Sequence, residues 1–314
     1  MTTSTGPARA TTRREKQHAA EALATAARQR RRRLLRYGIS ALALVLAATV
    51  TASIVLDRSA VPPALSETPA TSAVLAELTH VNVADLDIVA LPSAGLLAPP
   101  RKITGQPALA IGGKPEILYM GAEYCSLCAA QRWPLVIALA QFGSFVNLRE
   151  TYSASAPEPF PHTPTLSFHG SSYTSDYLTF TAVEMESNRP SGGSGDYLRL
   201  DTPTGAQMAL LNTLDVSADG KTSGGIPFID FGNQYAQVAG ANYSPALLAG
   251  RTPEQVAAVL GKSPSSEVAQ AILGSADVVT AEICAITNGQ PGDVCNRAGV
   301  ENALTGILSS QTGG

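Results

Sequence analysis

An uncharged stretch of 20 residues, from Tyr37 to Leu56, constrains the organisation of this chain more than any other feature. An α-helix rises about 1.5 Å per residue, so a stretch of this length crosses the roughly 30 Å hydrocarbon core of a bilayer. The apolar part of a cleaved signal peptide is shorter, about 7–15 residues, and follows a short basic region. Here 36 residues precede the apolar stretch. We therefore expect a single N-terminal transmembrane helix at 37–56, with a cleaved signal peptide as the alternative.

The charge differs on the two sides of this stretch. Residues 1–36 carry ten of the 22 lysines and arginines but only two glutamates, whereas the rest of the chain carries 12 basic and 23 acidic residues. By the positive-inside rule, the cluster Arg28–Arg36 keeps residues 1–36 in the cytoplasm and places the rest outside. We expect this cluster to contact lipid headgroups of the cell membrane, with RNA binding by the tail as a minor alternative. The acidic remainder argues against a nucleic-acid partner.

The part that follows the apolar stretch divides into a linker and one large domain. Residues 57–72 contain three prolines and show little hydrophobic periodicity, which is typical of a linker. Residues 73–308 are expected to form an extracytoplasmic domain, which is long enough to bury a core without depending on disulfides. With 45% hydrophobic and only 15% charged residues, the chain is not a disordered protein.

Strand-like and helix-like patterns alternate through this domain, which predicts a layered α/β fold. Residues 80–90 fit either a helix start or an early strand. The expected strands are 116–120, 145–149, 177–184 and 227–231, and the expected helices are 129–142, 204–214, 252–260 and 266–286.

A Cys-Ser-Leu-Cys motif, Cys125 to Cys128, stands between the expected strand at 116–120 and the expected helix at 129–142. This order places Cys125 at or near a helix N-terminus, where backbone N–H groups and the helix dipole favour a thiolate. Cys128 lies one turn later, within reach of a disulfide with Cys125. The spacing is typical of a dithiol whose first sulfur attacks and whose second resolves the mixed disulfide. Both cysteines are therefore candidate catalytic residues.

Two other interpretations of the motif stay open. A C-x-x-C pair is half of a zinc site, but the chain has no second C-x-x-C motif. His162 and His169 are candidates to complete such a site. A static structural disulfide between Cys125 and Cys128 is the other alternative. We expect neither a metal ion nor another cofactor.

A proline begins the expected strand at 227–231, in the sequence Gly-Gly-Ile-Pro-Phe. The bond between Ile226 and Pro227 is of the kind that adopts the cis form, and a proline here leaves strand-edge backbone groups free for an incoming chain. Tyr124 directly precedes Cys125 and offers a flat aromatic surface beside the attacking sulfur. We expect Tyr124, Ile226 and Pro227 to contact the substrate.

Ten residues separate the other two cysteines, Cys284 and Cys295. The Asn-Gly and Pro-Gly pairs between them favour turns, so the chain doubles back and brings the sulfurs together. A compartment outside the cytoplasm permits disulfides. We expect Cys284 and Cys295 to form a structural disulfide. A redox pair that exchanges with Cys125 and Cys128 is the alternative, and two free thiols are a third.

The order of a strand, C-x-x-C, a helix and a later Ile-Pro before a strand resembles the thioredoxin superfamily over roughly residues 116–260. More narrowly, the chain resembles the DUF929 family, uncharacterised membrane-anchored thioredoxin-like proteins, over most of residues 73–305. The resemblance implies a thioredoxin-like fold, and the roughly 100 residues from Cys125 to Pro227 imply an enlarged insertion. The motifs that carry the narrower resemblance are MGAEYCSLCAAQRWPLVIALAQFGSF, SSYTSDYLTF, GGIPFIDFGNQY, AEIC and DVC.

These features together predict a membrane-anchored thiol–disulfide oxidoreductase that acts on protein thiols or disulfides outside the cytoplasm. A thioredoxin-like binding module without turnover and a metallochaperone are the alternatives. Glu184, in the expected strand at 177–184, is a candidate proton acceptor for Cys128, although an exposed position at the strand end is the simpler interpretation. The direction of the redox reaction depends on how the protein stabilises one sulfur, which the sequence does not reveal.

Overall fold

The computed structural model describes residues 67–88, 96–192, 196–215 and 224–312. All of these residues belong to one compact unit that runs from Val61 to Gly314. The basic tail, the expected transmembrane helix at 37–56 and most of the expected linker at 57–72 lie outside the described residues.

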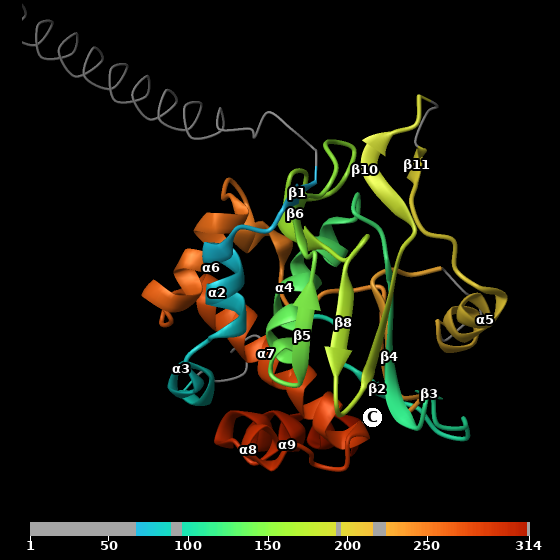
Figure 1. Cartoon of the computed structure of the whole chain (residues 1–314), viewed down its shortest axis with the longest axis vertical. Helices are drawn as coiled ribbons and strands as arrows, with labels where there is room; N and C mark the ends of the chain where they lie inside the picture. The colour runs from blue at the N-terminus through green and yellow to red at the C-terminus, as the bar shows by residue number, and fades with distance from the viewer. Residues whose placement is uncertain (1–66, 89–95, 193–195, 216–223, 313–314) are drawn as a thin grey trace, which may run out of the picture. The chain divides into compact units, whose positions relative to one another are not determined.

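A mixed sheet forms the centre of this unit (Figure 1). Strand β9 lies parallel to β4 on one side, and β12 lies antiparallel to β4 on the other. Strand β13 then pairs with β12, and β2 with β13, both antiparallel, while β3 pairs with the first residues of β4. The expected α/β class is confirmed. The strands are β2 (Arg101–Lys102), β3 (Ala110–Ile111), β4 (Lys114–Gly121), β9 (Thr179–Glu184), β12 (Phe228–Phe231) and β13 (Tyr235–Val238).

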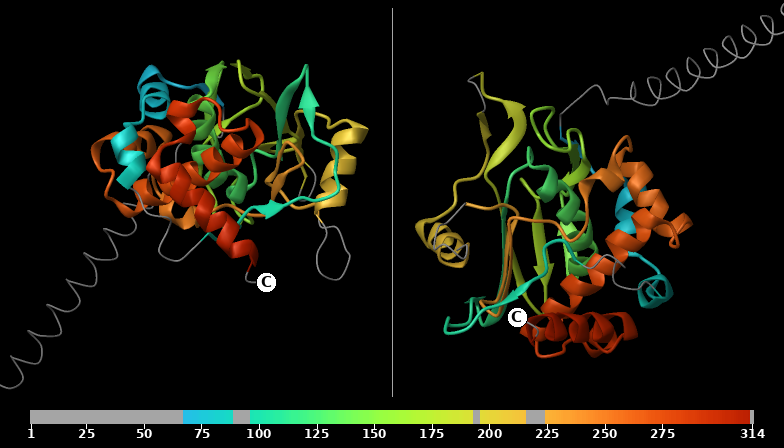
Figure 2. Two further views of the ribbon diagram at one scale, coloured as in Figure 1. Left: turned by 90° about the horizontal axis from the view of Figure 1, so that it is seen from below. Right: turned by 180° about the vertical axis from the view of Figure 1, so that it is seen from behind.

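Strand β4 is a continuous run of buried residues from Glu116 onward, because it has a strand on each side and a layer on each face. On one face, Ile117 and Tyr119 join the large hydrophobic core with the main helices. On the other face, Leu118 and Met120 pack in a smaller cluster with Leu211 of helix α5 (Gly205–Leu214). Figure 2 shows the sheet between these two layers.

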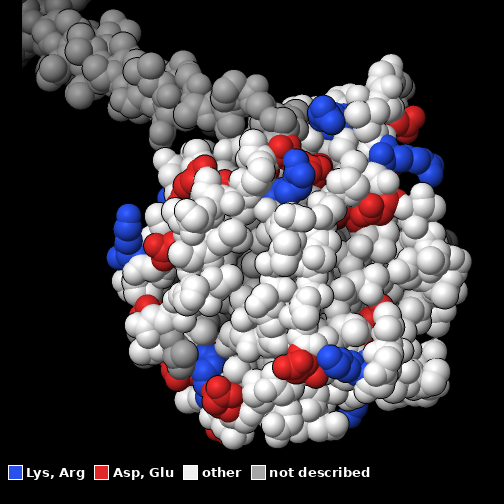
Figure 3. Space-filling model, viewed as in Figure 1, with Lys and Arg blue, Asp and Glu red and all other residues white. Residues whose placement is uncertain are grey.

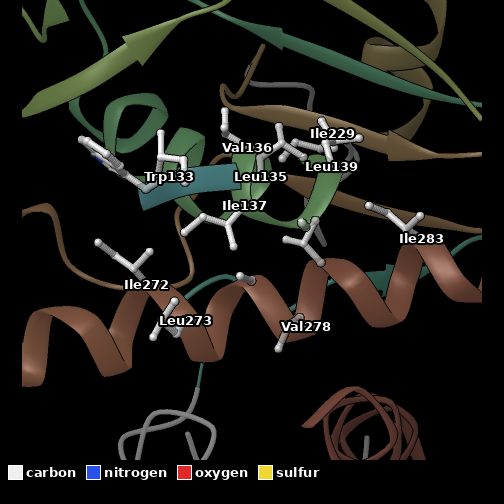
Figure 4. Packing of buried hydrophobic residues seen from close by; sticks show 14 of the residues in the cluster. Trp133, Leu135, Val136, Ile137, Leu139, Ile229, Ile272, Leu273, Val278 and Ile283 are labelled. Carbon is white, nitrogen blue, oxygen red and sulfur yellow. The ribbon is translucent and has the colours of Figure 1, made fainter. Parts of the chain in front are cut away.

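Helices α4 (Ser126–Ala140) and α7 (Glu267–Ile286) form the centre of the large core. Ile137 of α4 and Ile272 of α7 point toward one another across the interface of the two helices (Figure 4). Among the described residues, α7 is the one helix long and apolar enough to cross a membrane, and 89% of its most apolar window is buried within the domain. Its apolar character is therefore explained by packing in the core.

The other helices cover this core and the ends of α7. The undecided segment at 80–90 contains helix α3 rather than a strand. The helices are α2 (Ser72–Thr79), α3 (Val83–Ile88), η1 (Pro245–Leu248), α6 (Pro253–Lys262), α8 (Gly292–Cys295) and α9 (Ala298–Thr312).

In the ranges that the structure describes, seven shorter strands lie outside this sheet, and all but β1 belong to the long connections between α4 and β12. The expected strand at 145–149 is divided into two, β5 and β6, which pair with different partners. Strand β1 pairs with β6, so the fold includes residues that the sequence assigned to the linker. These strands are β1 (Thr68–Pro69), β5 (Gly143–Val146), β6 (Arg149–Tyr152), β7 (Pro164–Ser167), β8 (Ser172–Ser175), β10 (Glu186–Pro190) and β11 (Tyr197–Arg199).

Candidate active site

Cys125 is the residue that caps the N-terminus of α4. Its backbone is extended, with φ −72° and ψ 119°, and its Sγ accepts a hydrogen bond of 3.1 Å from the backbone N–H of Cys128. The turn after β4 therefore places the first sulfur against the positive end of the helix dipole, as the motif predicted. Cys125 is 6% exposed and Cys128 is fully buried, and both are free thiols.

The two thiols have different surroundings. Burial raises the pKa of the Cys128 thiol well above its usual value, and its contact with Cys125 acts in the same direction. The nearby Arg132 guanidinium works against this rise without cancelling it. Cys128 therefore stays protonated at neutral pH, whereas Cys125 lies nearer the surface and has the helix N-terminus beside its sulfur. This difference suits an attacking Cys125 and a resolving Cys128.

The loop before β12 brings Ile226 and Pro227 to the dithiol. The Cys125 thiol donates to the carbonyl oxygen of Ile226 at 3.9 Å, and the bond from Ile226 to Pro227 is cis. Gly225, directly before them, donates its backbone N–H to the Asp215 carboxylate at 2.8 Å. A segment about 100 residues away in the sequence thus lies within hydrogen-bonding distance of the attacking sulfur.

Tyr124 lies beside the dithiol but its ring is partly covered. It stacks on Tyr197 of β11, with ring centroids 4.5 Å apart and planes within 8°. Burial raises the pKa of Tyr124, and the nearby Glu186 and Glu158 carboxyl groups act in the same direction. Sequence analysis missed Tyr197, because no pattern around β11 indicates that the β10–β11 hairpin reaches the motif.

A carboxylate, Glu158, also lies at the N-terminus of α4. Its Oε1 accepts from the backbone N–H of Ser126 at 2.8 Å and from the Ser126 hydroxyl at 2.5 Å. Sequence analysis missed this residue as well. Glu158 stands 32 positions after Ser126 in an irregular loop, so no local spacing connects the two.

A buried ion pair lies one turn beyond Cys128. Arg132 Nε and Nη2 donate to the two oxygens of Glu184 at 2.8 and 2.7 Å, and both side chains are fully buried. The simpler interpretation of Glu184, an exposed strand end, is wrong because Glu184, although it is the last residue of β9, is fully buried against Arg132 of α4. Both carboxylate oxygens of Glu184 are engaged by Arg132, so they are not free to accept a proton from Cys128.

A second buried carboxyl group precedes the motif. Glu123 accepts a hydrogen bond of 2.6 Å from the Ser167 hydroxyl and is 1% exposed. Burial, together with a hydrogen bond to Glu67, raises the pKa of Glu123 to about 7. Glu67 itself forms an ion pair of 2.7 Å with Arg149. Burial therefore favours the protonated form of Glu123.

The two histidines considered for a metal site, His162 and His169, have other surroundings in the structure. His169 Nδ1 hydrogen-bonds to Asp201 at 3.1 Å, and His162 lies in a turn with φ 57°. In the part of the chain that the structure describes, no group of three or more His, Cys, Asp or Glu side chains is arranged to hold a metal ion.

Cys284 and Cys295 form a disulfide that ties the end of α7 to α8. Helix α4 has 15 residues, which gives a length of about 22 Å. Gln141, directly after the end of α4, donates to Thr280 of α7, one turn before Cys284. The disulfide therefore lies at the end of α4 opposite to Cys125, roughly 20 Å from it.

The fold and the site define a mixed α/β protein with a dithiol at a helix N-terminus. Residues 101–193 match a family described as "Domain of unknown function (DUF929)". The matched segment contains Cys125, Cys128 and Glu158, and it ends before Pro227 and the disulfide. No curated protein matches the chain, and no solved structure matches it.

Proposed function

We propose that this chain is a membrane-anchored thiol–disulfide oxidoreductase that uses Cys125 and Cys128 on protein substrates outside the cytoplasm. One observation carries the proposal. The Cys125 sulfur accepts from the Cys128 backbone N–H and donates to the Ile226 carbonyl, so it lies between a helix N-terminus and the backbone of the loop before β12. This arrangement provides both an activated sulfur and a place for a substrate backbone.

The reaction proceeds by two exchange steps. The Cys125 thiolate attacks a substrate disulfide, forms a mixed disulfide and releases one substrate sulfur as a thiolate. Cys128 then loses its proton and attacks the Cys125 sulfur, which breaks the mixed disulfide and releases the second substrate sulfur. Two electrons and two protons pass to the substrate, and Cys125–Cys128 becomes a disulfide. The reverse sequence oxidises a substrate dithiol.

The residues around Cys125 suit an extended substrate segment. The Ile226 carbonyl is near enough to the sulfur to pair with a substrate backbone N–H, and the Tyr124–Tyr197 stack forms an aromatic wall beside it. Pro227, which has no N–H, directly precedes β12. These residues form the proposed substrate site.

Three features support a thioredoxin-like fold for this domain. The strand before the motif, β4, lies between a parallel strand and an antiparallel strand that follows a proline, which is the arrangement that the resemblance implies. Pro134 lies inside the helix after the motif. The elements β5–β8, together with β10, β11 and α5, account for the enlarged insertion.

The proposal also includes the anchor that the sequence indicates. The uncharged stretch at 37–56 spans the membrane, the Arg28–Arg36 cluster holds residues 1–36 in the cytoplasm, and the α/β domain faces outward. A reporter that is active only outside the cytoplasm, fused after Gly314, should be active. An inactive fusion that is nevertheless found in the membrane would contradict this orientation.

The catalytic proposal is tested with single-cysteine variants. The wild-type chain should reduce insulin disulfides when a small dithiol regenerates it, and Cys125→Ser should abolish this activity because the attacking sulfur is gone. Cys128→Ser should instead accumulate mixed disulfides, seen as higher-mass bands on non-reducing gels. Residual activity of Cys125→Ser equal to that of the wild type would refute the proposal.

A binding module without turnover is the second candidate. It is favoured by the 6% exposure of Cys125, which limits access to the sulfur. Under this alternative, the wild type and Cys125→Ser would bind the same partner equally well, and neither would reduce insulin. The cysteine variants therefore separate the two functions.

A further inference from the structure

Two negative groups share the N-terminus of α4. Of the first backbone amides of this helix, that of Cys128 donates to the Cys125 sulfur and that of Ser126 donates to Glu158. The Glu158 carboxylate also accepts from the Ser126 hydroxyl. A helix N-terminus stabilises an anion through these amides and through the helix dipole. Here the carboxylate takes part of the stabilisation that would otherwise serve a Cys125 thiolate.

The loop that carries Glu158 is held firmly against the dithiol. The backbone N–H of Glu158 donates to the Ser155 carbonyl at 3.2 Å, and that of Ala154 donates to the Tyr124 carbonyl at 3.0 Å. The Ser153 hydroxyl donates to the Phe160 carbonyl at 3.0 Å. The carboxylate is thus fixed relative to the residue directly before Cys125.

The basic side chain next to the dithiol is already paired with another carboxylate. Arg132, the basic group that acts on Cys128, already forms a two-point ion pair with Glu184. Glu158 and Glu186 both raise the pKa of Tyr124, and Glu186 lies opposite Arg199 in the β10–β11 pair. Glu158 is therefore the carboxylate that bonds directly to the helix N-terminus beside Cys125.

The geometry points to Glu158 as a positioning residue that disfavours the Cys125 thiolate and sets the dithiol to act as a reductant. This inference rests on the proposed function. A protein that stabilises a thiolate stabilises the reduced form of the pair and becomes an oxidant, so disfavouring the thiolate has the opposite effect. In the forward reaction, the Cys125–Cys128 dithiol gives two electrons and two protons to a substrate disulfide. A dithiol donor outside the cytoplasm then reduces the new disulfide.

The test compares Glu158→Gln with the matched control Glu186→Gln in the full-length chain. Glutamine keeps an oxygen that accepts from Ser126 and removes only the charge. The control removes a nearby negative charge that makes no hydrogen bond to α4. The first readout is the rate of alkylation of Cys125 by iodoacetamide across pH, localised by mass spectrometry. The second is the equilibrium of the Cys125–Cys128 pair with glutathione.

Glu158→Gln should speed the alkylation of Cys125 at pH 7 by about fivefold to tenfold, as expected for the loss of one nearby like charge at a partly screened site. The pH at half-maximal rate should shift downward. The equilibrium constant for oxidation by glutathione should fall by a similar factor. Glu186→Gln should change each quantity by less than about twofold.

Glu158→Ala provides a second variant, and it should change both readouts in the same direction as Glu158→Gln. The inference would be overturned if the alkylation rate and the glutathione equilibrium of Glu158→Gln matched those of the wild type or of Glu186→Gln. Failure of the proposed function is distinguishable, because it appears as a wild type that does not reduce insulin. Alkylation of Cys125 requires no turnover and still reports on Glu158 in that case.

Discussion

The two cysteine pairs of this chain have nearly the same exposure but very different surroundings. Cys125 and Cys128 are 6% and 0% exposed, and Cys284 and Cys295 are 7% and 8% exposed. The first pair lies where a helix N-terminus, a carbonyl of the loop before β12 and several carboxyl groups meet. The second pair belongs to the hydrophobic core between α7 and α8. The comparison teaches that polar partners, rather than solvent exposure, distinguish a candidate redox pair from a structural one.

Charge is also distributed unevenly on the surface. On the face in Figure 3, basic and acidic side chains are interspersed towards its upper and lower parts, and the middle of the face carries little charge. Two carboxylates, Glu158 and Glu186, nevertheless lie near Tyr124 or Cys125 at the dithiol. The local field at the dithiol therefore differs from that of the visible surface.

The largest effect on stability should come from removing the second pair. The double variant Cys284→Ala/Cys295→Ala should lower the free energy of unfolding by about 3 kcal/mol, because the bond closes a short loop in the unfolded chain. Insulin reduction should be unchanged, since the disulfide lies at the far end of α4 from Cys125. Denaturant unfolding and the insulin assay measure the two quantities.

The two cysteine pairs should also differ in how easily they are reduced. Differential alkylation across graded redox buffers should show that Cys125–Cys128 opens under mild reduction while Cys284–Cys295 persists. The reduced, unmodified chain treated with the same alkylating agent after denaturation serves as the control for complete labelling. A variant Cys284→Ala that lost turnover without losing stability would instead favour exchange between the pairs.

A smaller effect should come from the buried carboxyl group at the dithiol end. The pKa of Glu123 is raised to about 7 in the folded chain. The unfolded chain loses this proton near pH 4.5, whereas the folded chain keeps it until about pH 7. The free energy of unfolding therefore falls as pH rises from about 4.5 to 7 and does not fall further above pH 7. Glu123→Gln keeps a neutral group there and should raise the free energy of unfolding at pH 8 by about 2 kcal/mol, with little change at pH 4.

Thermal and denaturant unfolding at the two pH values measure this difference. Asp176→Asn is the matched control, because Asp176 is an exposed carboxylate on the connection between β8 and β9. It should show no such difference between pH 4 and pH 8. Equal behaviour of the two variants would show that Glu123 does not hold a proton in the folded chain.

Several elements were predictable because local patterns determine them. Helix α6 has Thr252 as its N-cap residue and a proline and Glu254 in its first turn. In the structure, Thr252 forms a capping box. Strands β4 and β12 follow from short apolar runs, and β9 follows from the alternation of apolar and polar residues at 177–184. Residues 80–90 were ambiguous because a segment of that length fits both periods, and packing of α3 against α9 and α7 decides for a helix.

The candidate site was predictable only in part. Cys125, Cys128, Ile226 and Pro227 were found because a motif and a proline before a strand are visible in the sequence. The structure brings all four together. Glu158, Tyr197 and the partner of Glu184 were missed. They come from loops and from a helix face whose contacts with the site have no local signal.

By itself, the sequence determined the α/β class, the position of the dithiol before a helix and the pairing of the last two cysteines. These depend on residue types and spacings within one or two neighbouring elements, where local conformational preferences act. Only the tertiary structure decided three contacts. Glu158 shares the N-terminus of α4 with Cys125, Arg132 forms an ion pair with Glu184, and Glu67 hydrogen-bonds to Glu123. Each of these contacts joins segments far apart in the chain. Their energies depend on burial and distance, which exist only after the core has packed.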